Sequence, residues 1–201
     1  MKREERFILM TLQEFELWLS PILPVRIITH IQQHHTYIPS YTYFSGSNHL
    51  DLQNSIRDYH VRHKGFRGIG QHFTTFPDGL IMTGRSMERD PACINRQNQG
   101  GICLEHLGNF DLGNDEMRID QQETIVGMTA GLCRHFSLPL NTDSIVYHHW
   151  FDLDTGERNN GRENNKTCPG TNFFGGNSPE DCVTKFLPLI ASALLSRQII
   201  I

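Results

Sequence analysis

Short apolar runs alternate along this chain with segments whose apolar residues recur at helical spacing, and this alternation constrains the fold more than any other feature. The apolar runs of strand length are 25–35, 101–108 and 144–150. The segments with helical spacing or helix-capping signals are 11–19, 49–63, 120–136 and the stretch that begins at Ser178-Pro179. Strands interleaved with helices predict an α/β fold with a central mixed β-sheet flanked by α-helices.

The sequence also predicts a β-hairpin and a single domain. Residues 70–85, GQHFTTFPDGLIMTGR, predict two short strands joined by the turn FPDG, which Gly79 closes. The sequence shows no internal repeat and no linker that would separate domains. We therefore expect one domain over 1–201, with a short leading helix at 11–19 and a core over about 26–187.

Composition excludes several classes of partner. A formal charge of −4 and a pI of 6.2 offer no broad attraction to phosphate backbones or anionic lipid, so we expect no nucleic-acid partner. The N-terminus lacks the pattern of a secretory signal and the tail ASALLSRQIII is too short to span a bilayer. We expect no membrane insertion and a cytoplasmic product, unless another factor releases it. The five cysteines are odd in number and scattered, which predicts reduced thiols.

Two pairs of adjacent histidines lie at the ends of predicted strands, and a cysteine follows downstream. The pairs are His34-His35 and His148-His149, and Cys168 lies in the turn sequence KTCPG. Neighbouring strand residues face opposite ways, so at most one histidine of each pair can enter a shared site. Two imidazoles and one thiolate suit a catalytic zinc site with a fourth position left for water. The alternative is that eleven histidines include chance pairs and that Cys168 is an ordinary small buried residue.

Several motifs, in this order along the chain, resemble those of the zinc-dependent N-acetylmuramoyl-L-alanine amidases. This superfamily includes phage lysozyme-type amidases, cell-wall-recycling amidases and animal peptidoglycan-recognition proteins. The resemblance covers roughly residues 30–187. The motifs are HHT at 34–36, GIGQHFTTFPDGLIMTGR at 68–85, GICLEHLGNFD at 101–111, and YHHW followed by KTCPG within 147–170.

The resemblance implies a role for individual residues. It gives His34, His148 and Cys168 as the Zn²⁺ ligands; the cysteine is as in the phage and recognition-protein branches, whereas the recycling branch has aspartate there. Lys166 matches a lysine that assists catalysis. Glu105 lies where the recycling branch has its catalytic glutamate, which implies a general base. A surface glutamate and an ordinary loop lysine remain the alternatives for these two residues.

Two departures from the family pattern affect the expected site. Phage and recognition proteins usually carry a catalytic tyrosine just before the residue matching His72, and this chain has Gln71, which is neither an acid nor a base. The loop between His148 and Cys168 is longer than usual and is either an extra wall of the substrate groove or a tolerated insertion. The residues predicted to contact substrate are His35, Thr36, Gln71, Arg85, Asn109 and Phe110.

The implied activity is hydrolysis of the amide between N-acetylmuramic acid and L-alanine, in peptidoglycan or in muramoyl-peptide fragments. A non-catalytic peptidoglycan-binding module of the same fold and a zinc peptidase acting on the peptide stem are the rival hypotheses. The sequence leaves open whether the biological role is that of an endolysin, an autolysin or a recycling enzyme. It also leaves open the diaminoacid preference and the oligomeric state.

Overall fold

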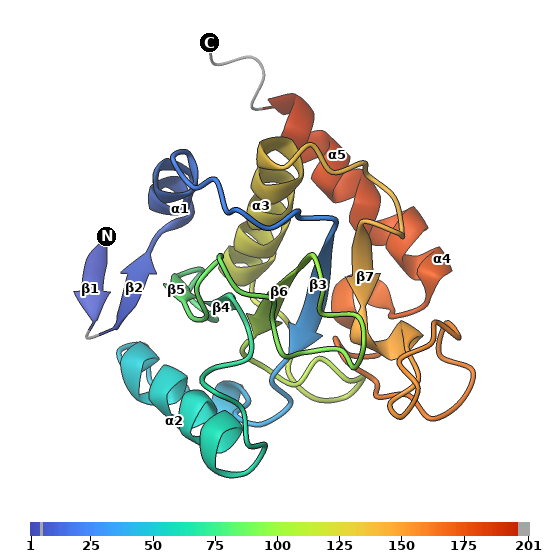
Figure 1. Cartoon of the computed structure of the whole chain (residues 1–201), viewed down its shortest axis with the longest axis horizontal. Helices are drawn as coiled ribbons and strands as arrows, with labels where there is room; N and C mark the ends of the chain where they lie inside the picture. Colours follow the sequence, from blue (N-terminus) through green and yellow to red (C-terminus); the bar gives the residue numbers. More distant parts are fainter. Residues whose placement is uncertain (5, 197–201) are drawn as a thin grey trace.

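The centre of the protein is a seven-stranded mixed sheet in the order β1-β2-β5-β4-β6-β3-β7 (Figure 1). The computed structural model describes residues 1–4 and 6–196. The strands are β1 Lys2–Glu4, β2 Phe7–Met10, β3 His30–His35, β4 Phe73–Thr75, β5 Ile81–Thr83, β6 Gly101–His106 and β7 Ile145–Tyr147. The predicted α/β class with a mixed sheet is confirmed.

The sheet has an antiparallel half and a parallel half. Strands β1, β2, β5 and β4 pair antiparallel, whereas β4, β6, β3 and β7 run parallel. The predicted hairpin is β4–β5, and its turn is closed by Gly79, whose amide donates to the Phe76 carbonyl at 3.0 Å. Parallel strands end at the same edge of a sheet. The parallel half therefore brings the ends of β3, β6 and β7 together.

The helices form where capping and spacing predicted them. They are α1 Leu12–Leu19, α2 His49–Arg62, α3 Ile119–His135, α4 Pro179–Asp181 and α5 Leu187–Ser196. Thr11 and Glu14 form a capping box at the start of α1, which fixes where this helix begins. A π-helical turn, Cys182–Phe186, joins α4 to α5. No helix among the described residues is long and apolar enough to cross a membrane.

Helices cover both faces of the sheet. Helices α1, α3 and α5 lie on one side of the sheet and α2 lies on the other (Figure 1). On the larger side, Phe15 of α1 and Met128 of α3 pack into a core with Phe73, Ile31 and Leu104 from the strands. On the α2 side the core is smaller, and its strand residues come from β2 and β5. Among the described residues of this smaller core, none lies within β3 or β6, and Leu107 follows directly after β6.

The predicted strand at 25–35 begins later than expected. Val25 is 93% exposed and Ile27 is 81% exposed, and β3 starts only at His30. The segment before it is held by Arg26, which donates to the Met87 carbonyl at 2.6 Å and pairs with Asp90. Apolar, β-branched content alone therefore overestimated this strand. Strands β1 and β2, the N-terminal hairpin that extends the antiparallel half, were not predicted from the sequence.

The prediction of reduced thiols is wrong for two of the cysteines. Cys93 and Cys103 form a disulfide that ties the loop before β6 to that strand. The loop folds back because the Asn98 side-chain oxygen accepts hydrogen bonds from the amides of Cys93 and Ile94. Scattered cysteines in the sequence gave no sign of this closure. The other three cysteines, Cys133, Cys168 and Cys182, are free and buried.

Candidate metal centre

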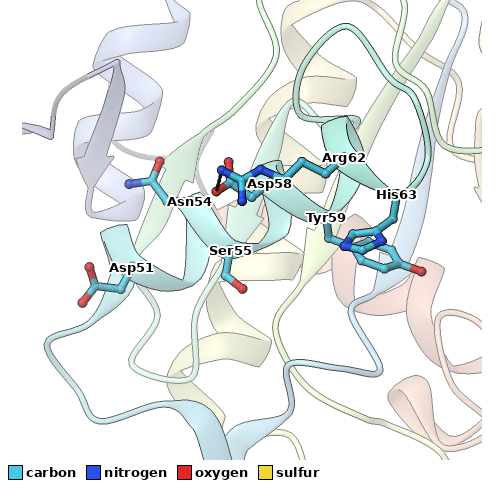
Figure 2. A pocket seen from close by; sticks show the side chains of 7 residues that line it. All are labelled: Asp51, Asn54, Ser55, Asp58, Tyr59, Arg62 and His63. Atoms are coloured by element: carbon cyan, nitrogen blue, oxygen red, sulfur yellow. Dashed lines mark ion pairs between the residues drawn. The ribbon is translucent and has the colours of Figure 1, made fainter.

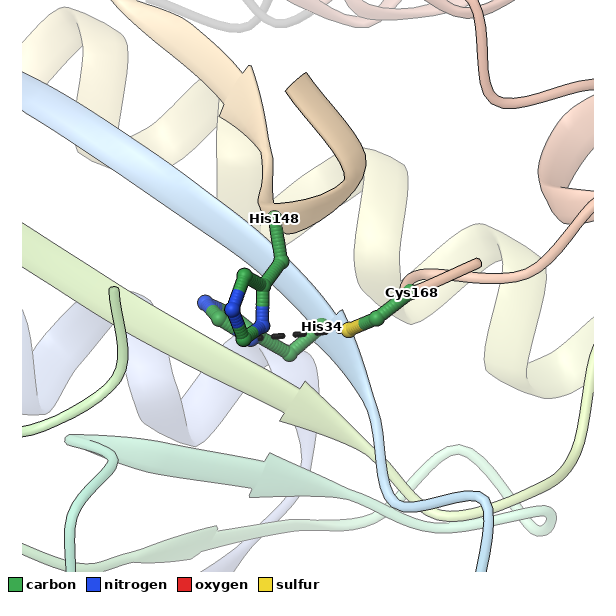
Figure 3. A group of neighbouring side chains, drawn as sticks. All are labelled: His34, His148 and Cys168. Atoms are coloured by element: carbon green, nitrogen blue, oxygen red, sulfur yellow. Dashed lines mark hydrogen bonds between the residues drawn. The ribbon is translucent and has the colours of Figure 1, made fainter. Parts of the chain in front are cut away.

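Three potential metal donors converge at the ends of the parallel strands. His34 lies near the end of β3, His148 begins the 3-10 turn His148–Trp150 after β7, and Cys168 lies in the loop that leads to α4. Figure 3 shows the two imidazoles and the thiol pointing toward one another. Their donor atoms all lie within 4.8 Å of one another, and His34 Nδ1 is 3.5 Å from Cys168 Sγ. The donors that the resemblance implied are therefore brought together.

The chemistry of this donor set fits a metal ion. The three residues are at most 8% exposed, and His34 Nε2 has no hydrogen-bond partner among the described residues. Burial, together with the Lys166 charge, lowers the pKa of His148 to about 3, and burial also holds the pKa of His34 well below its usual value. Both imidazoles are thus neutral and able to ligate. Burial raises the pKa of the Cys168 thiol, so a bound metal would have to displace its proton.

The second histidine of each pair faces away from the donors. The His35 ring accepts a hydrogen bond from the Phe110 amide at Nδ1, and its pKa falls to about 4 because it is buried. His149 donates from Nδ1 to the Lys166 carbonyl at 2.6 Å. The His35 backbone amide also donates to Cys168 Sγ at 3.4 Å and so helps to position the sulfur. Strand alternation thus separates His34 from His35.

Glu105 lies beside the donor cluster. In the parallel pairing of β3 and β6, His34 is opposite Glu105, so both side chains project from the same face of the sheet. Burial raises the pKa of Glu105 from 4.5 to about 8, and the Lys166 charge partly opposes this rise. The Glu105 side chain nevertheless remains partly exposed. A carboxyl group with this environment could exchange a proton near neutral pH.

Lys166 approaches the same place from the loop. It is exposed, lies two positions before Cys168, and its positive charge lowers the pKa of His34, His148 and Glu105. An exposed ammonium group at the rim of a buried donor set is suited to neutralise negative charge that develops there. The structure therefore places both predicted catalytic side chains near the candidate ligands, while their roles stay predictions.

The predicted substrate contacts fit the structure less well. Gln71 is 0% exposed and donates to Thr74 Oγ1, and Phe110 is 1% exposed and packs against Tyr41. Their burial leaves neither side chain a surface for substrate in this conformation. The prediction that Gln71 and Phe110 contact substrate did not take into account that a residue next to a site can lie in the core.

The remaining predicted contacts make internal hydrogen bonds. Thr36 accepts from the Gly108 amide at 2.9 Å, and the Asn109 side chain accepts from the Asp111 amide at 3.1 Å. Arg85 donates to the Ile69 carbonyl at 2.8 Å. Since Thr36 and Arg85 keep partly exposed side chains, a substrate contact at these two positions stays a prediction.

The long loop after His148 is a packed structure. Asn95 donates to the carbonyls of Leu153 and Asp154, and Gln97 donates to the Gly156 carbonyl. These bonds fasten the loop to the segment before β6, so the loop is fixed on the body of the protein. Whether it forms a wall of a substrate groove stays a prediction.

A hollow lies on the outer face of α2 (Figure 2). Seven polar side chains line it, all from α2 and the residue that follows it: Asp51, Asn54, Ser55, Asp58, Tyr59, Arg62 and His63. Asp58 is already paired with Arg57 and Arg62. The hollow contains none of the converging donors and is a polar helix surface rather than a catalytic cavity.

Comparison with known proteins agrees with this geometry. The model of the N-acetylmuramoyl-L-alanine amidase family matches residues 24–171. The fold is similar to Drosophila PGRP-LB, with 17% identity over 80% of this chain and 82% of that one and a TM-score of 0.59. It is also similar to amidase LysC from Clostridium intestinale, with 21% identity over 79% and 85% of the two chains and a TM-score of 0.54.

A further similar structure is a Drosophila PGRP-LB point mutant in complex with tracheal cytotoxin. It shares 17% identity over 80% of this chain and 83% of that one, with a TM-score of 0.55. At these identities the structural likeness establishes the fold. No curated protein sequence matches the chain.

Proposed function

Because this chain belongs to the N-acetylmuramoyl-L-alanine amidase family, we propose that it is a zinc-dependent hydrolase that cleaves the amide between N-acetylmuramic acid and L-alanine. The observation that carries the proposal is the convergence of two neutral imidazoles and one thiol within 4.8 Å at the sheet edge. Two nitrogen donors and one sulfur donor form the three-ligand set of a catalytic zinc site.

His34, His148 and Cys168 would hold the zinc. When bound there, zinc supplies Lewis-acid chemistry, which polarises a carbonyl and lowers the pKa of water. Cys168 gives up its thiol proton on binding, while the His35 amide holds the sulfur in place. The two histidines need no deprotonation, because burial already keeps them neutral.

Glu105 acts as the general base. Glu105 lies opposite His34 on the same face of the sheet. Because its pKa is raised to about 8, its protonated carboxyl group can also donate a proton. The carboxylate can therefore take a proton from the attacking water and return it to the leaving amine. A cation near the carboxylate would lower this pKa toward neutrality.

Lys166 stabilises the oxyanion that develops on the scissile carbonyl. Its ammonium group lies on the exposed rim of the site, close enough for its charge to act on His148 and Glu105. A positive charge at this position favours the transition state more than the neutral amide substrate.

The substrate is peptidoglycan or a muramoyl-peptide released from it. Support comes from the family itself and from the similar PGRP-LB fold, which binds tracheal cytotoxin in its solved complex. The partly exposed Thr36 and Arg85 are the predicted positions from which this chain would contact the muramoyl peptide.

The test is a digest of purified peptidoglycan, analysed by mass spectrometry, with and without a zinc chelator. An amidase releases intact stem peptides that start with a free L-alanine, and the chelator stops the release. His34→Ala should be inactive, while His35→Ala is the matched control because its ring faces away from the donors.

The rival hypotheses give different products in the same digest. A peptidase on the stem would release shortened peptides and leave L-alanine attached to the sugar. A non-catalytic binding module would sediment with the peptidoglycan and release nothing. Either result would refute the proposed activity.

A further inference from the structure

His34 belongs to a second group of potential metal donors. Its imidazole, Cys93 Sγ and Cys103 Sγ also lie within 4.8 Å of one another. Cys103 is opposite Gln32 in the pairing of β3 and β6, so it projects from the same face of the sheet as His34. The two groups share His34 and no other residue, and in the structure the two sulfurs of the second group are joined as a disulfide.

Hydrogen bonds hold the second group in place independently of the disulfide. The Asn98 side chain accepts from the Cys93 amide at 2.9 Å, and the Asn98 carbonyl accepts from the Gly101 amide at 3.0 Å. Gln32 of β3 donates to the Gln97 carbonyl at 2.7 Å. Because these bonds fasten the loop to β3 and β6, reduction of the disulfide would leave both thiols beside His34.

The oxidation state decides whether these sulfurs can ligate. Thiolates are strong zinc ligands, whereas disulfide sulfurs are not among the donors that zinc uses in proteins. His34 is 3% exposed, and its Nε2 has no hydrogen-bond partner among the described residues. Cys93 is only half-buried, so a reductant can approach the disulfide from that side. Reduction would therefore add two strong donors next to an imidazole that already serves the first group.

We propose that the Cys93–Cys103 disulfide is a redox switch, and that its reduction creates a second zinc site that takes His34 from the first. A dithiol reductant transfers two electrons and two protons to the disulfide and is itself oxidised to a disulfide. The two new thiols lose their protons to solvent when they bind the metal. Loss of His34 from the first group dismantles the catalytic set, so the reduced protein is the inactive form. This regulatory role rests on the proposed function.

Cobalt(II) binding to the purified full-length protein tests the proposal, because thiolate-to-cobalt charge-transfer absorption reports how many thiolates ligate. For the wild type we expect about one thiolate per cobalt in the oxidised protein and about two or more after reduction. Cys168→Ser isolates the second site. It should show no thiolate absorption when oxidised and about two thiolates when reduced.

Two variants serve as controls for the remaining thiols and for folding. The double variant Cys93→Ser/Cys103→Ser should give the same spectrum before and after reduction, which excludes Cys133 and Cys182 as sources of the signal. The single variant Cys93→Ser keeps the buried Cys103 in β6, and in the Cys168→Ser background it should lower the thiolate count of the reduced protein from about two to about one. A thermal melt of each variant verifies that it is folded.

The outcomes separate this proposal from the proposed function. If the oxidised wild type shows one thiolate and reduced Cys168→Ser shows none, the amidase site stands and the switch is refuted. A different result would be that the oxidised wild type shows no thiolate bound to cobalt while the reduced Cys168→Ser variant does. In that case the second donor group binds metal, but the proposed amidase site is refuted, and the regulation that depends on it is refuted as well. Loss of muramoyl-peptide cleavage on reduction, reversed on reoxidation, completes the support.

Discussion

Replacing Glu105 by glutamine should stabilise the metal-free protein at alkaline pH. Burial raises the pKa of Glu105 from 4.5 to about 8 in the folded state. Between these values the folded protein keeps a proton that the unfolded chain has lost. The wild-type carboxyl therefore contributes stability that is fully present below about pH 4.5 and is lost as the pH rises through about 8. Glutamine does not titrate, so the Glu105→Gln variant does not lose this part of its free energy of unfolding as the pH rises.

The structure sets the size of the effect. The difference between 4.5 and about 8 is about 3.5 pH units, and each unit corresponds to about 1.4 kcal/mol, which gives a ceiling of about 5 kcal/mol. Glu105 is partly exposed and water screens part of the penalty, so we expect roughly 2–3 kcal/mol. For a chain of 201 residues this corresponds to a difference in Tm of roughly 4–12 °C.

Thermal melts in the presence of a chelator, from about pH 5 to about pH 8.5, measure this difference. The buried histidines titrate alike in wild type and variant, so subtracting the two Tm curves isolates Glu105. The exposed Glu123 on α3 supplies the matched control, because Glu123→Gln should leave the wild-type curve unchanged in shape. If the difference between Glu105→Gln and wild type is constant across the range, the carboxyl is not desolvated and the reasoning is wrong.

Three further predictions concern the site with metal present. The variants expected to lose zinc, measured by metal analysis after purification, are His34→Ala, His148→Ala and Cys168→Ser. His35→Ala and His149→Ala should keep most of the metal, since their rings contact the Phe110 amide and the Lys166 carbonyl instead; zinc loss in these two would contradict the assigned orientation. Glu105→Gln should lower muramoyl-peptide turnover by roughly 10²- to 10⁴-fold with zinc retained, whereas zinc loss in this variant would indicate a ligand. Gln71→Ala should retain measurable turnover but lower Tm, and complete loss of cleavage in the folded, zinc-loaded variant would contradict the assignment of the acid/base role to Glu105.

The sequence predicted the elements whose signals are local. Helix α1 follows a capping box, α3 carries a long apolar repeat, and the β4–β5 hairpin is announced by its turn residues. Val25 and Ile27 are β-branched but lie in solvent, whereas β3 itself, HIQQHH, contains only one β-branched residue, Ile31. Strand propensity reflects burial against neighbouring strands, which composition alone does not reveal. Strands as short as β1 and β2 also show too few residues for a period to be recognised.

The site could be predicted only where alternation along one strand or a family motif described it. Alternation correctly required His34 and His35 to face opposite ways. The pairing of His34 with Glu105 depends on the register between β3 and β6, which are far apart in the sequence. The disulfide depends on the folding back of residues 93–98 through the Asn98 side chain. The pairing of His34 with Glu105 is a tertiary contact and the disulfide closes a local loop, and neither cysteine spacing nor hydrophobic periodicity encodes them.

The burial of Gln71 bears on the proposed mechanism, which does without the tyrosine that related proteins usually carry. Gln71 donates to Thr74, and Thr74 donates to Gln53 of α2, so this position contributes to the attachment of α2 to the sheet. On the next strand, Glu105 lies opposite Thr74 on one side and His34 on the other. In the proposed mechanism the acid/base group therefore lies on β6, beside the metal ligands, and not just before β4 at the position of Gln71. A tyrosine restored at Gln71 would meet this packed polar contact rather than the site, so Gln71→Tyr should lower stability without raising turnover.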